Sequence, residues 1–188
     1  MVRSFLAIEI PEDIRKKMYE SFARLHRQAG SVKWITPLHM HLTLCFLGEQ
    51  EDYLLYEKII PSVQEIACDM KQLTFSLKGV GLFPSLDKPR VFWVGIEGET
   101  LFLKTFLGSL YLRLMDMPEP LERKEFQAHV SLARIQGLAK RKVWQKALEE
   151  YEKIDFGSFV ASEVILFKSE FRREGMLYTP LKKFSFKK

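Results

Sequence analysis

Two short stretches, His41-Leu42-Thr43-Leu44 and His129-Val130-Ser131-Leu132, follow one pattern of histidine, apolar residue, hydroxyl residue and apolar residue. In a β-strand alternate side chains point to the same face. As strands, both stretches would place the histidine and the hydroxyl on one face and the two apolar side chains on the other. The repeat therefore predicts two strands that each present an imidazole and a hydroxyl to a common space.

This combination of groups suits a phosphate ester. Two imidazoles with ordinary pKa values near about 6.5 can move protons on both sides of a phosphorus atom at neutral pH, and hydroxyls can bind its oxygens. Residue usage predicts that such a pair arises by chance in only about a few chains per thousand. The duplication thus favours catalysis over the alternative of two hydrogen-bonded core histidines.

A metal site is a second interpretation of the same histidines. His39 shares a face with His41 if the strand begins early, and together with His129 they could supply three nitrogen ligands. However, no Asp, Glu or Cys-x-x-Cys pair lies close in sequence to either stretch, and hydroxyls are poor zinc ligands. We therefore expect no bound metal.

Two further side chains depend on how regular the strands are. Strict alternation places Cys45 on the face of His41 and Thr43, as in a cysteine–histidine nucleophile pair, although a small buried hydrophobe is the favoured interpretation. Arg134 would clamp phosphate with its forked guanidinium. Strict alternation places it opposite Ser131, so it reaches the site only if the strand twists or bulges.

Composition bounds the class of protein. The 188 residues are 47% hydrophobic and 28% charged, which is ordinary for a globular chain. A net charge of +5 and a pI near 9.1 favour a polyanionic partner, with a plainly solvated basic surface as the alternative. No apolar run is long enough for a membrane span, no signal-peptide layout is present, and the two cysteines form no disulfide pattern, so a cytoplasmic protein is expected. The absence of asparagine beside abundant Lys, Glu and Arg points weakly to a heat-adapted source.

Hydrophobic periodicity predicts the order of elements. Strands are expected at residues 2–10, 40–47, 73–82, 91–96 and 128–135, with closing strands between 156 and 186, and helices at 11–30, 50–68, 99–115 and 139–151. Pro61 should kink or split the second helix. The order strand, helix, motif strand, helix and strands occurs nearly twice. It predicts two similar α+β halves whose pseudo-twofold arrangement brings His41 and His129 together.

With these features the chain resembles the two-histidine (2H) phosphoesterases, most closely the RNA 2′,3′-cyclic phosphodiesterases also called 2′-5′ RNA ligases. The likeness spans nearly the whole chain and is most specific in two segments. Residues 41–48 match the family form H-x-T-L-x-F-L-G, and residues 126–134 are similar to F-x-P-H-[VI]-[ST]-L-x-R. Residues 3–7, 83–93 and 169–178 resemble its opening strand, middle turn and closing segment. His39 and Ala128 depart from the asparagine and proline that are usual in the family.

The resemblance implies a bilobal α+β fold in which each lobe has an antiparallel sheet flanked by helices. One domain over residues 1–188 would consist of two intertwined lobes with the active site in the central cleft. It also implies hydrolysis, without metal or cofactor, of a 2′,3′-cyclic phosphate on RNA ends or nucleotides to a 2′-phosphomonoester by a protein that we expect to be monomeric. ATP-independent 2′-5′ ligation of cyclic-phosphate and 5′-hydroxyl RNA ends, and a nucleotide-binding module without turnover, are the alternatives.

The resemblance also implies roles for single residues. The motif pair would act as proton donor and proton acceptor, three side chains would bind the phosphate, and three others are candidate nucleotide contacts. In that order they are His41 and His129; Thr43, Ser131 and Arg134; and Arg3, Phe5 and His39.

Overall fold

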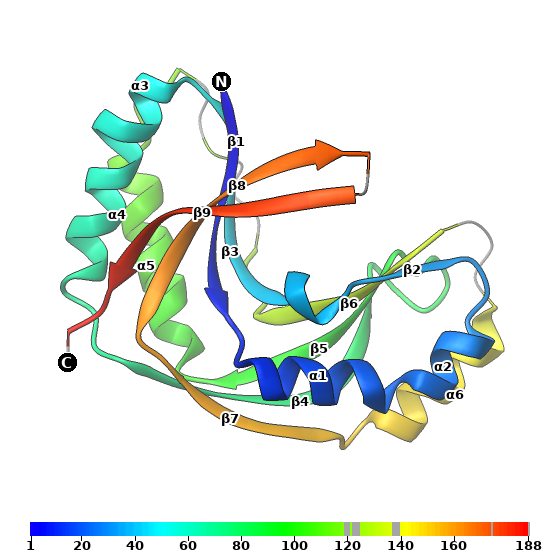
Figure 1. The fold of residues 1–188 in the computed structure, drawn as a ribbon. Helices are drawn as coiled ribbons and strands as arrows, with labels where there is room; N and C mark the ends of the chain where they lie inside the picture. Colours follow the sequence, from blue (N-terminus) through cyan, green and yellow to red (C-terminus); the bar gives the residue numbers. More distant parts are fainter. Residues whose placement is uncertain (119–120, 122–124, 137–139, 174, 188) are drawn as a thin grey trace.

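The computed structural model describes residues 1–118, 121, 125–136, 140–173 and 175–187. Within them, nine strands form one antiparallel sheet in the order β7-β4-β5-β6-β3-β1-β8-β9, with β2 beside β6 (Figure 1). The strands are β1 Val2–Glu9, β2 Val32–Trp34, β3 His41–Gln50, β4 Leu73–Phe83, β5 Val91–Gly98, β6 His129–Ile135, β7 Asp155–Ala161, β8 Glu163–Arg172 and β9 Gly175–Ser185. The helices are α1 Glu12–Ser21, α2 Ala23–Gln28, α3 Asp52–Leu54, α4 Ile60–Ala67, α5 Thr100–Arg113 and α6 Arg141–Tyr151, with short turns η1 Pro37–His39 and η2 Leu55–Ile59.

The sheet has two halves that meet at the motif strands. One half is β3-β1-β8-β9 and the other is β6-β5-β4-β7. Between them, β3 and β6 are in register at Leu42 and Val130, and both of these side chains are fully buried. The motif strand occupies the same place in each half, so the two motifs lie side by side at the centre of the molecule. The expected α+β fold of antiparallel strands flanked by helices is confirmed, and the sheets expected for two lobes are joined into one through β3 and β6.

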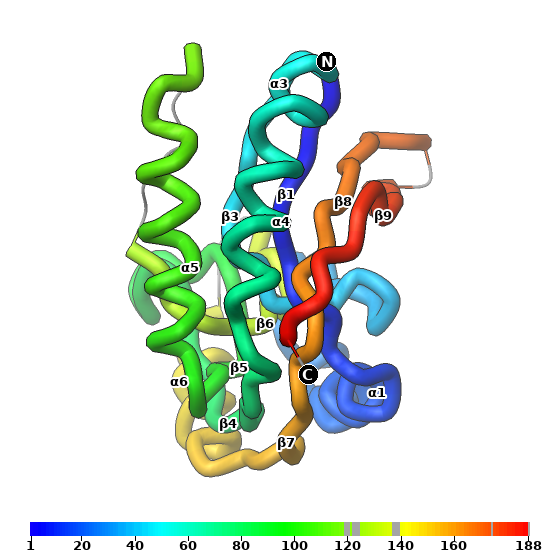
Figure 2. Tube along the Cα trace, turned by 90° about the vertical axis from the view of Figure 1, so that its left-hand side faces the viewer, coloured from blue at the N-terminus to red at the C-terminus, as the bar shows by residue number. Residues whose placement is uncertain are grey.

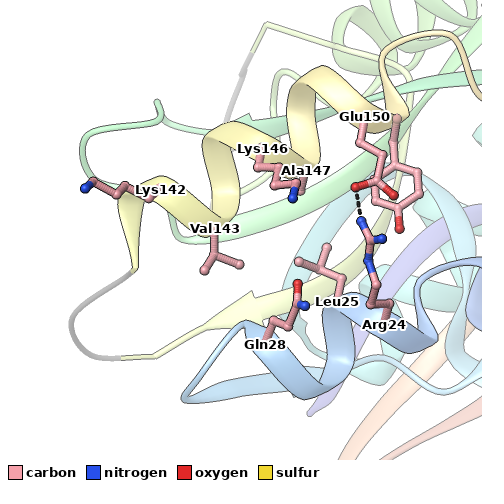
Figure 3. A pocket seen from close by; sticks show the side chains of 9 residues that line it. Arg24, Leu25, Gln28, Lys142, Val143, Lys146, Ala147 and Glu150 are labelled. Atoms are coloured by element: carbon pink, nitrogen blue, oxygen red, sulfur yellow. Dashed lines mark hydrogen bonds and ion pairs between the residues drawn. The ribbon is translucent and has the colours of Figure 1, made fainter.

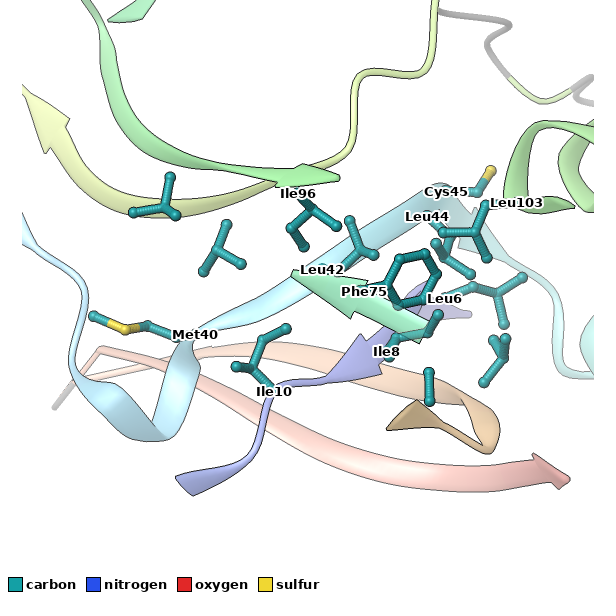
Figure 4. Packing of buried hydrophobic residues seen from close by; sticks show 14 of the residues in the cluster. Leu6, Ile8, Ile10, Met40, Leu42, Leu44, Cys45, Phe75, Ile96 and Leu103 are labelled. Carbon is teal, nitrogen blue, oxygen red and sulfur yellow. The ribbon is translucent and has the colours of Figure 1, made fainter. Parts of the chain in front are cut away.

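Helices cover each half separately. Helices α4 and α5 contact β9, β3 and each other, whereas α1 contacts β7 and α6 contacts β4. Figure 2 shows α4 and α5 running side by side along the first half. The main core is continuous across both halves, as Figure 4 shows for Leu6 and Ile8 of β1, Leu42 and Leu44 of β3, Phe75 of β4, Ile96 of β5 and Leu103 of α5.

Strand β1 is buried on both of its faces. Leu6 and Ile8 lie in the main core, while Phe5 and Ala7 lie in a second cluster on the other face of the strand. Residues on opposite faces of one strand thus line two different apolar layers, because the side-chain period of a strand is two. The second layer contains Phe5 and Phe167, whose rings pack against His41.

Two predicted helices are divided in the structure. The segment expected as one helix over 11–30 forms α1 and α2, because Phe22 leaves helical geometry (φ −99°, ψ 11°) and is fully buried against Phe92. The segment over 50–68 widens into the π-helical turn η2 before Pro61 enters the first turn of α4, where its missing N–H costs no hydrogen bond. No helix among the described residues has both the length and the hydropathy needed to cross a membrane.

Candidate functional site

The pairing of β3 with β6 arranges the four polar motif side chains. Because the strands are antiparallel and Leu42 faces Val130, the residues on either side of that pair match in the opposite order. His41 is therefore beside Ser131, and Thr43 is beside His129, on the face turned away from the core. Each histidine lies diagonally across from the other, and all four side chains are partly buried. The sequence-predicted pairs are thus brought to one small patch.

Both motif strands contain a β-bulge at the same position, one residue after the hydroxyl. On β3, Thr43 faces Ala7 and Cys45 faces Leu6, so Leu44 is an extra residue. On β6, Ser131 faces Trp93 and Ala133 faces Phe92, so Leu132 is the extra residue. A bulge reverses the alternation of the side chains that follow it.

The bulge on β3 makes one prediction wrong. Cys45 does not share the face of His41 and Thr43, because the extra Leu44 turns its side chain into the core, where it is 4% exposed. Its Sγ lies 3.7 Å from the hydroxyl of Tyr111 on α5. Burial raises the pKa of the Cys45 thiol, which disfavours the thiolate that a nucleophile needs. Cys45 is a core residue.

The bulge on β6 has the opposite consequence for Arg134. Ala133 and Ile135 are buried in the main core, so Arg134 between them points to the other face, which is also the face of His129 and Ser131. The strand thus has the bulge that this prediction required. Arg134 is exposed at the end of β6 and stays a predicted phosphate ligand.

Both histidine rings are oriented by the backbone two residues earlier. The Nδ1–H of His129 donates to the carbonyl oxygen of Gln127 at 2.7 Å, and the ring of His41 is hydrogen-bonded by the backbone of His39. In neutral His129 this bond leaves Nε2 as the free lone pair. The contact that orients His41 is made by a backbone group, so the histidine side chain at position 39 leaves that contact intact.

Aromatic rings enclose His41. The ring of Phe5 is stacked on it with centroids 5.0 Å apart, and Tyr178 and Phe167 lie 5.5 and 6.4 Å away. This burial lowers the pKa of His41 to about 4, opposed by the hydrogen bond that the ring donates to the His39 backbone and assisted by nearby positive charges. A protonated His41 would therefore be a strong acid.

A second pair of rings holds His129. Phe83 meets it edge-on with centroids 4.9 Å apart, and Trp93 lies 6.2 Å away. Burial lowers the pKa of His129 as well, with the hydrogen bond to Gln127 opposing the shift. The structure thus places Phe83 of β4 and Trp93 of β5 against the second motif histidine.

The family of the chain follows from comparison with known proteins. A sequence profile described as LigT like Phosphoesterase matches residues 8–93. The RNA 2′,3′-cyclic phosphodiesterase of Archaeoglobus fulgidus is 30% identical over 187 residues, which cover 97% of this chain and 99% of that protein. The chain belongs to the LigT-like two-histidine phosphoesterases.

Two further known proteins are similar to the chain, one in sequence and one in fold. The RNA 2′,3′-cyclic phosphodiesterase of Aeropyrum pernix is 32% identical over 155 residues, or 80% of this chain and 84% of that protein. The crystal structure of TT0787 of Thermus thermophilus superposes with a TM-score of 0.81 at 27% identity, covering 98% of this chain and 97% of that one. The likeness to each of these two proteins therefore extends over most of the chain.

The three predicted nucleotide contacts occupy different environments. Arg3 is exposed on β1, on the same side of the strand as Phe5. Phe5 is 3% exposed, so its ring supports His41 and has no free face for a base, contrary to that prediction. His39 is partly buried in η1, where its Nδ1 lies 3.1 Å from Thr36 Oγ1 and its ring lies 5.2 Å from Tyr178.

The alternative metal site is not assembled. Among the residues that the structure describes, no three His, Cys, Asp or Glu side chains gather as ligands. His39 turns toward Thr36 and Tyr178 and does not join His41 and His129 in a three-nitrogen site.

Sequence reasoning missed two aromatic residues around His41 and a third beside Phe5. Phe167 of β8 and Tyr178 of β9 contact it from the far end of the chain, and Phe46, 67% exposed, lies 6.0 Å from Phe5. Tyr178 had a signal, since it ends the closing segment that resembles the 2H family. Phe167 had none, because an apolar strand residue reads as ordinary core.

Replacing Phe5 by Leu should lower turnover about ten- to hundredfold, because the His41 ring loses the stack that fixes its position. Unfolding free energy should fall by about 1 kcal/mol. The opened enclosure should also raise the pKa of His41 from about 4, which a titration of the ring protons by NMR would show.

Phe159→Leu is the matched control. Phe159 is 7% exposed on β7 and packs on Phe75, away from either histidine. The Phe159→Leu variant should lose a similar unfolding free energy, whereas its turnover and the pKa of its His41 should stay as in the native protein. Equal activities for the two variants would show that Phe5 does not position His41.

Proposed function

We propose that this protein hydrolyses 2′,3′-cyclic phosphate, on RNA ends or on nucleotides, to a 2′-phosphomonoester through a histidine pair and without a metal. The observation that carries the proposal is the Leu42–Val130 pairing, which sets two imidazoles and two hydroxyls on one face of the sheet. The names of the A. fulgidus and A. pernix relatives support the same substrate class.

The reaction is an in-line displacement at phosphorus. Water attacks the phosphorus while Nε2 of His129 takes its proton, and the bond from phosphorus to the 3′ oxygen breaks as His41 donates a proton to that oxygen. The products are a 2′-phosphomonoester and a 3′-hydroxyl, and the two histidines exchange their extra proton with solvent. Thr43, Ser131 and Arg134 stabilise the charge on the non-bridging oxygens.

The lowered pKa values of the two histidines fit the base role of His129 as the protein stands. They fit the acid role of His41 once a substrate is bound. His129 is neutral at pH 7 and ready to accept a proton, since burial lowers its pKa. His41 must hold a proton in the complex, and the negative charge of a bound phosphodiester raises its pKa from the value of about 4 in the free protein. Substrate binding and protonation of His41 are therefore coupled.

This coupling predicts two different pH optima. The kcat/KM profile reports the free protein, in which the pair shares one proton and both pKa values lie below their ordinary range. Its optimum should therefore fall below about pH 6.5. The kcat optimum, which reports the complex, should lie at higher pH because the phosphate raises the pKa of the acid. Coincident profiles with an optimum above pH 7 would contradict this account.

A direct test follows the fate of the phosphate. Purified protein is incubated with a 2′,3′-cyclic mononucleotide and with an RNA that ends in a cyclic phosphate, and products are identified by phosphorus NMR. A 2′-phosphomonoester is expected from both. A 3′-phosphate would mean that the substrate lies reversed, with the acid and base roles exchanged. Binding without turnover would mean that the protein is a nucleotide-binding module. If a 5′-hydroxyl RNA is supplied and a joined RNA forms, the protein also has ligase activity.

A further inference from the structure

A strongly basic surface lies at one end of the molecule, where three segments of the chain meet. We call it the basic end. Its cations are all exposed. They are Lys33 on β2, Lys88 and Arg90 on the β4–β5 turn, and, on the segment that leads from the end of β6 to the start of α6, Arg134, Lys140, Arg141 and Lys142. The same segments contain one carboxylate, Asp87, which is paired with Arg141 at 3.4 Å.

The basic end accounts for the net charge of the whole protein. It contains seven of the 29 Lys and Arg residues and one of the 24 Asp and Glu residues. The rest of the chain therefore has 22 basic and 23 acidic residues and is nearly neutral. The basic pI is thus a property of one region, which is the distribution expected of a binding surface for a polyanion.

Direct contacts hold the three segments together. Lys33 and Arg134 are register partners on β2 and β6. The backbone N–H of Ile135 donates to the carbonyl of Arg90 at 2.9 Å, and the Arg141–Asp87 ion pair joins α6 to the β4–β5 turn. In Figure 1 this end lies on the right, where β2 and the end of β6 approach α2 and α6.

The basic end borders the catalytic face through Arg134 and its register partner Lys33. Arg134 lies on the same face of β6 as Ser131 and His129, about 15 Å from His129 along the strand. Phe83, the last residue before the β4–β5 turn, contacts His129. A chain bound by its terminal phosphate at the histidines therefore meets these cations within its next few nucleotides.

The neighbouring groove between α2 and α6 has a different character (Figure 3). Arg24, Lys142 and Lys146 line it together with one carboxylate, Glu150. Arg24 is paired with Glu150 across the groove, so the charge of Arg24 is already compensated. Figure 3 shows Lys142, which also belongs to the basic end, at the outer end of α6 and away from this pair.

We propose that the basic end binds the sugar–phosphate backbone of the RNA segment that leads to the cyclic phosphate. The inference rests on the proposed function and adds an extended RNA as the preferred substrate. Exposed Lys and Arg side chains bind phosphates without reading bases. The contribution should therefore be independent of sequence and sensitive to salt.

The test compares two triple variants that remove the same charge. Lys88→Ala/Lys140→Ala/Lys142→Ala changes the basic end, and Lys58→Ala/Lys153→Ala/Lys182→Ala changes three exposed lysines elsewhere. Arg141 is kept because its ion pair supports the turn. With an oligonucleotide of about ten residues that ends in a cyclic phosphate, the first variant should raise KM about tenfold. The slope of log(kcat/KM) against log salt should become shallower by about 2.

The mononucleotide separates this inference from the proposed function. Both variants should turn over a 2′,3′-cyclic mononucleotide at the native rate, because it is too short to reach the altered lysines. Equal effects of the two variants on the oligonucleotide would overturn the proposal, since general charge would then explain binding.

A binding measurement makes the result independent of turnover. The same RNA with a 3′-hydroxyl end is titrated by fluorescence anisotropy, and the basic-end variant should bind about tenfold more weakly than the control variant. Unchanged RNA affinity, or weakened binding to phosphatidylserine vesicles alone, would assign the surface to a partner other than RNA. If the native protein does not turn over the 2′,3′-cyclic mononucleotide, the proposed function is contradicted. The weaker RNA binding of the basic-end variant would still support the proposed RNA surface.

Discussion

His129→Ala and His41→Ala should each lower turnover of a 2′,3′-cyclic phosphate by about 10²–10⁴-fold, the range for removal of a positioned acid or base. Both rings are on the face of the sheet away from the core, and the structure holds each with a backbone hydrogen bond and packed aromatic rings. The core residues Leu42 and Val130 beside them are untouched. The fold should therefore persist, which thermal unfolding followed by circular dichroism would confirm.

Three control variants make this result specific. Thr43→Ala and Ser131→Ala each remove one hydrogen bond to phosphate and should reduce the rate only about two- to tenfold. His26→Ala removes a partly buried imidazole that packs on Trp34 outside the site, and its turnover should match the native protein.

Two outcomes would contradict the assignment. Near-native turnover by either motif variant would mean that its histidine is neither acid nor base. Loss of native activity in a chelator, with rescue by added zinc, would mean that a metal provides the chemistry.

Sulfur in place of the 3′ oxygen should restore turnover to His41→Ala and leave His129→Ala impaired. A thiolate, with a pKa of about 8.5 for its conjugate acid, departs without a proton, whereas a sugar alkoxide needs one. The acid variant should thus recover most of its loss of about 10²–10⁴-fold. The base variant should keep its deficit, because the attacking water must still lose a proton. Release of the thiol can be followed continuously with a chromogenic disulfide.

This experiment decides the roles because the two motifs are nearly equivalent. The strand pattern, the bulge and the backbone hydrogen bond occur in both halves. The environments differ in burial, which lowers the pKa of His41 further than that of His129. Recovery of the His129 variant in place of the His41 variant would reverse the acid and base assignment made from the family resemblance.

Local alternation in the sequence was enough to predict the two motif strands and the faces of β1. His41 and Thr43 face away from Leu42 because a strand has a period of two, and the same rule separates Phe5 from Leu6. These two properties need no information beyond neighbouring residues. The order of elements along the chain also predicted two similar halves.

Tertiary structure alone decided which way the chain points after each motif. The extra residues Leu44 and Leu132 are defined only by the strands that pair with them, and no local pattern marks a bulge. Each reverses the alternation, so Cys45 turns inward and Arg134 shares the face of His129 and Ser131. The lowered pKa of His41 likewise needs rings brought from β1, β8 and β9, because desolvation depends on what surrounds a group in space and not on its neighbours in sequence.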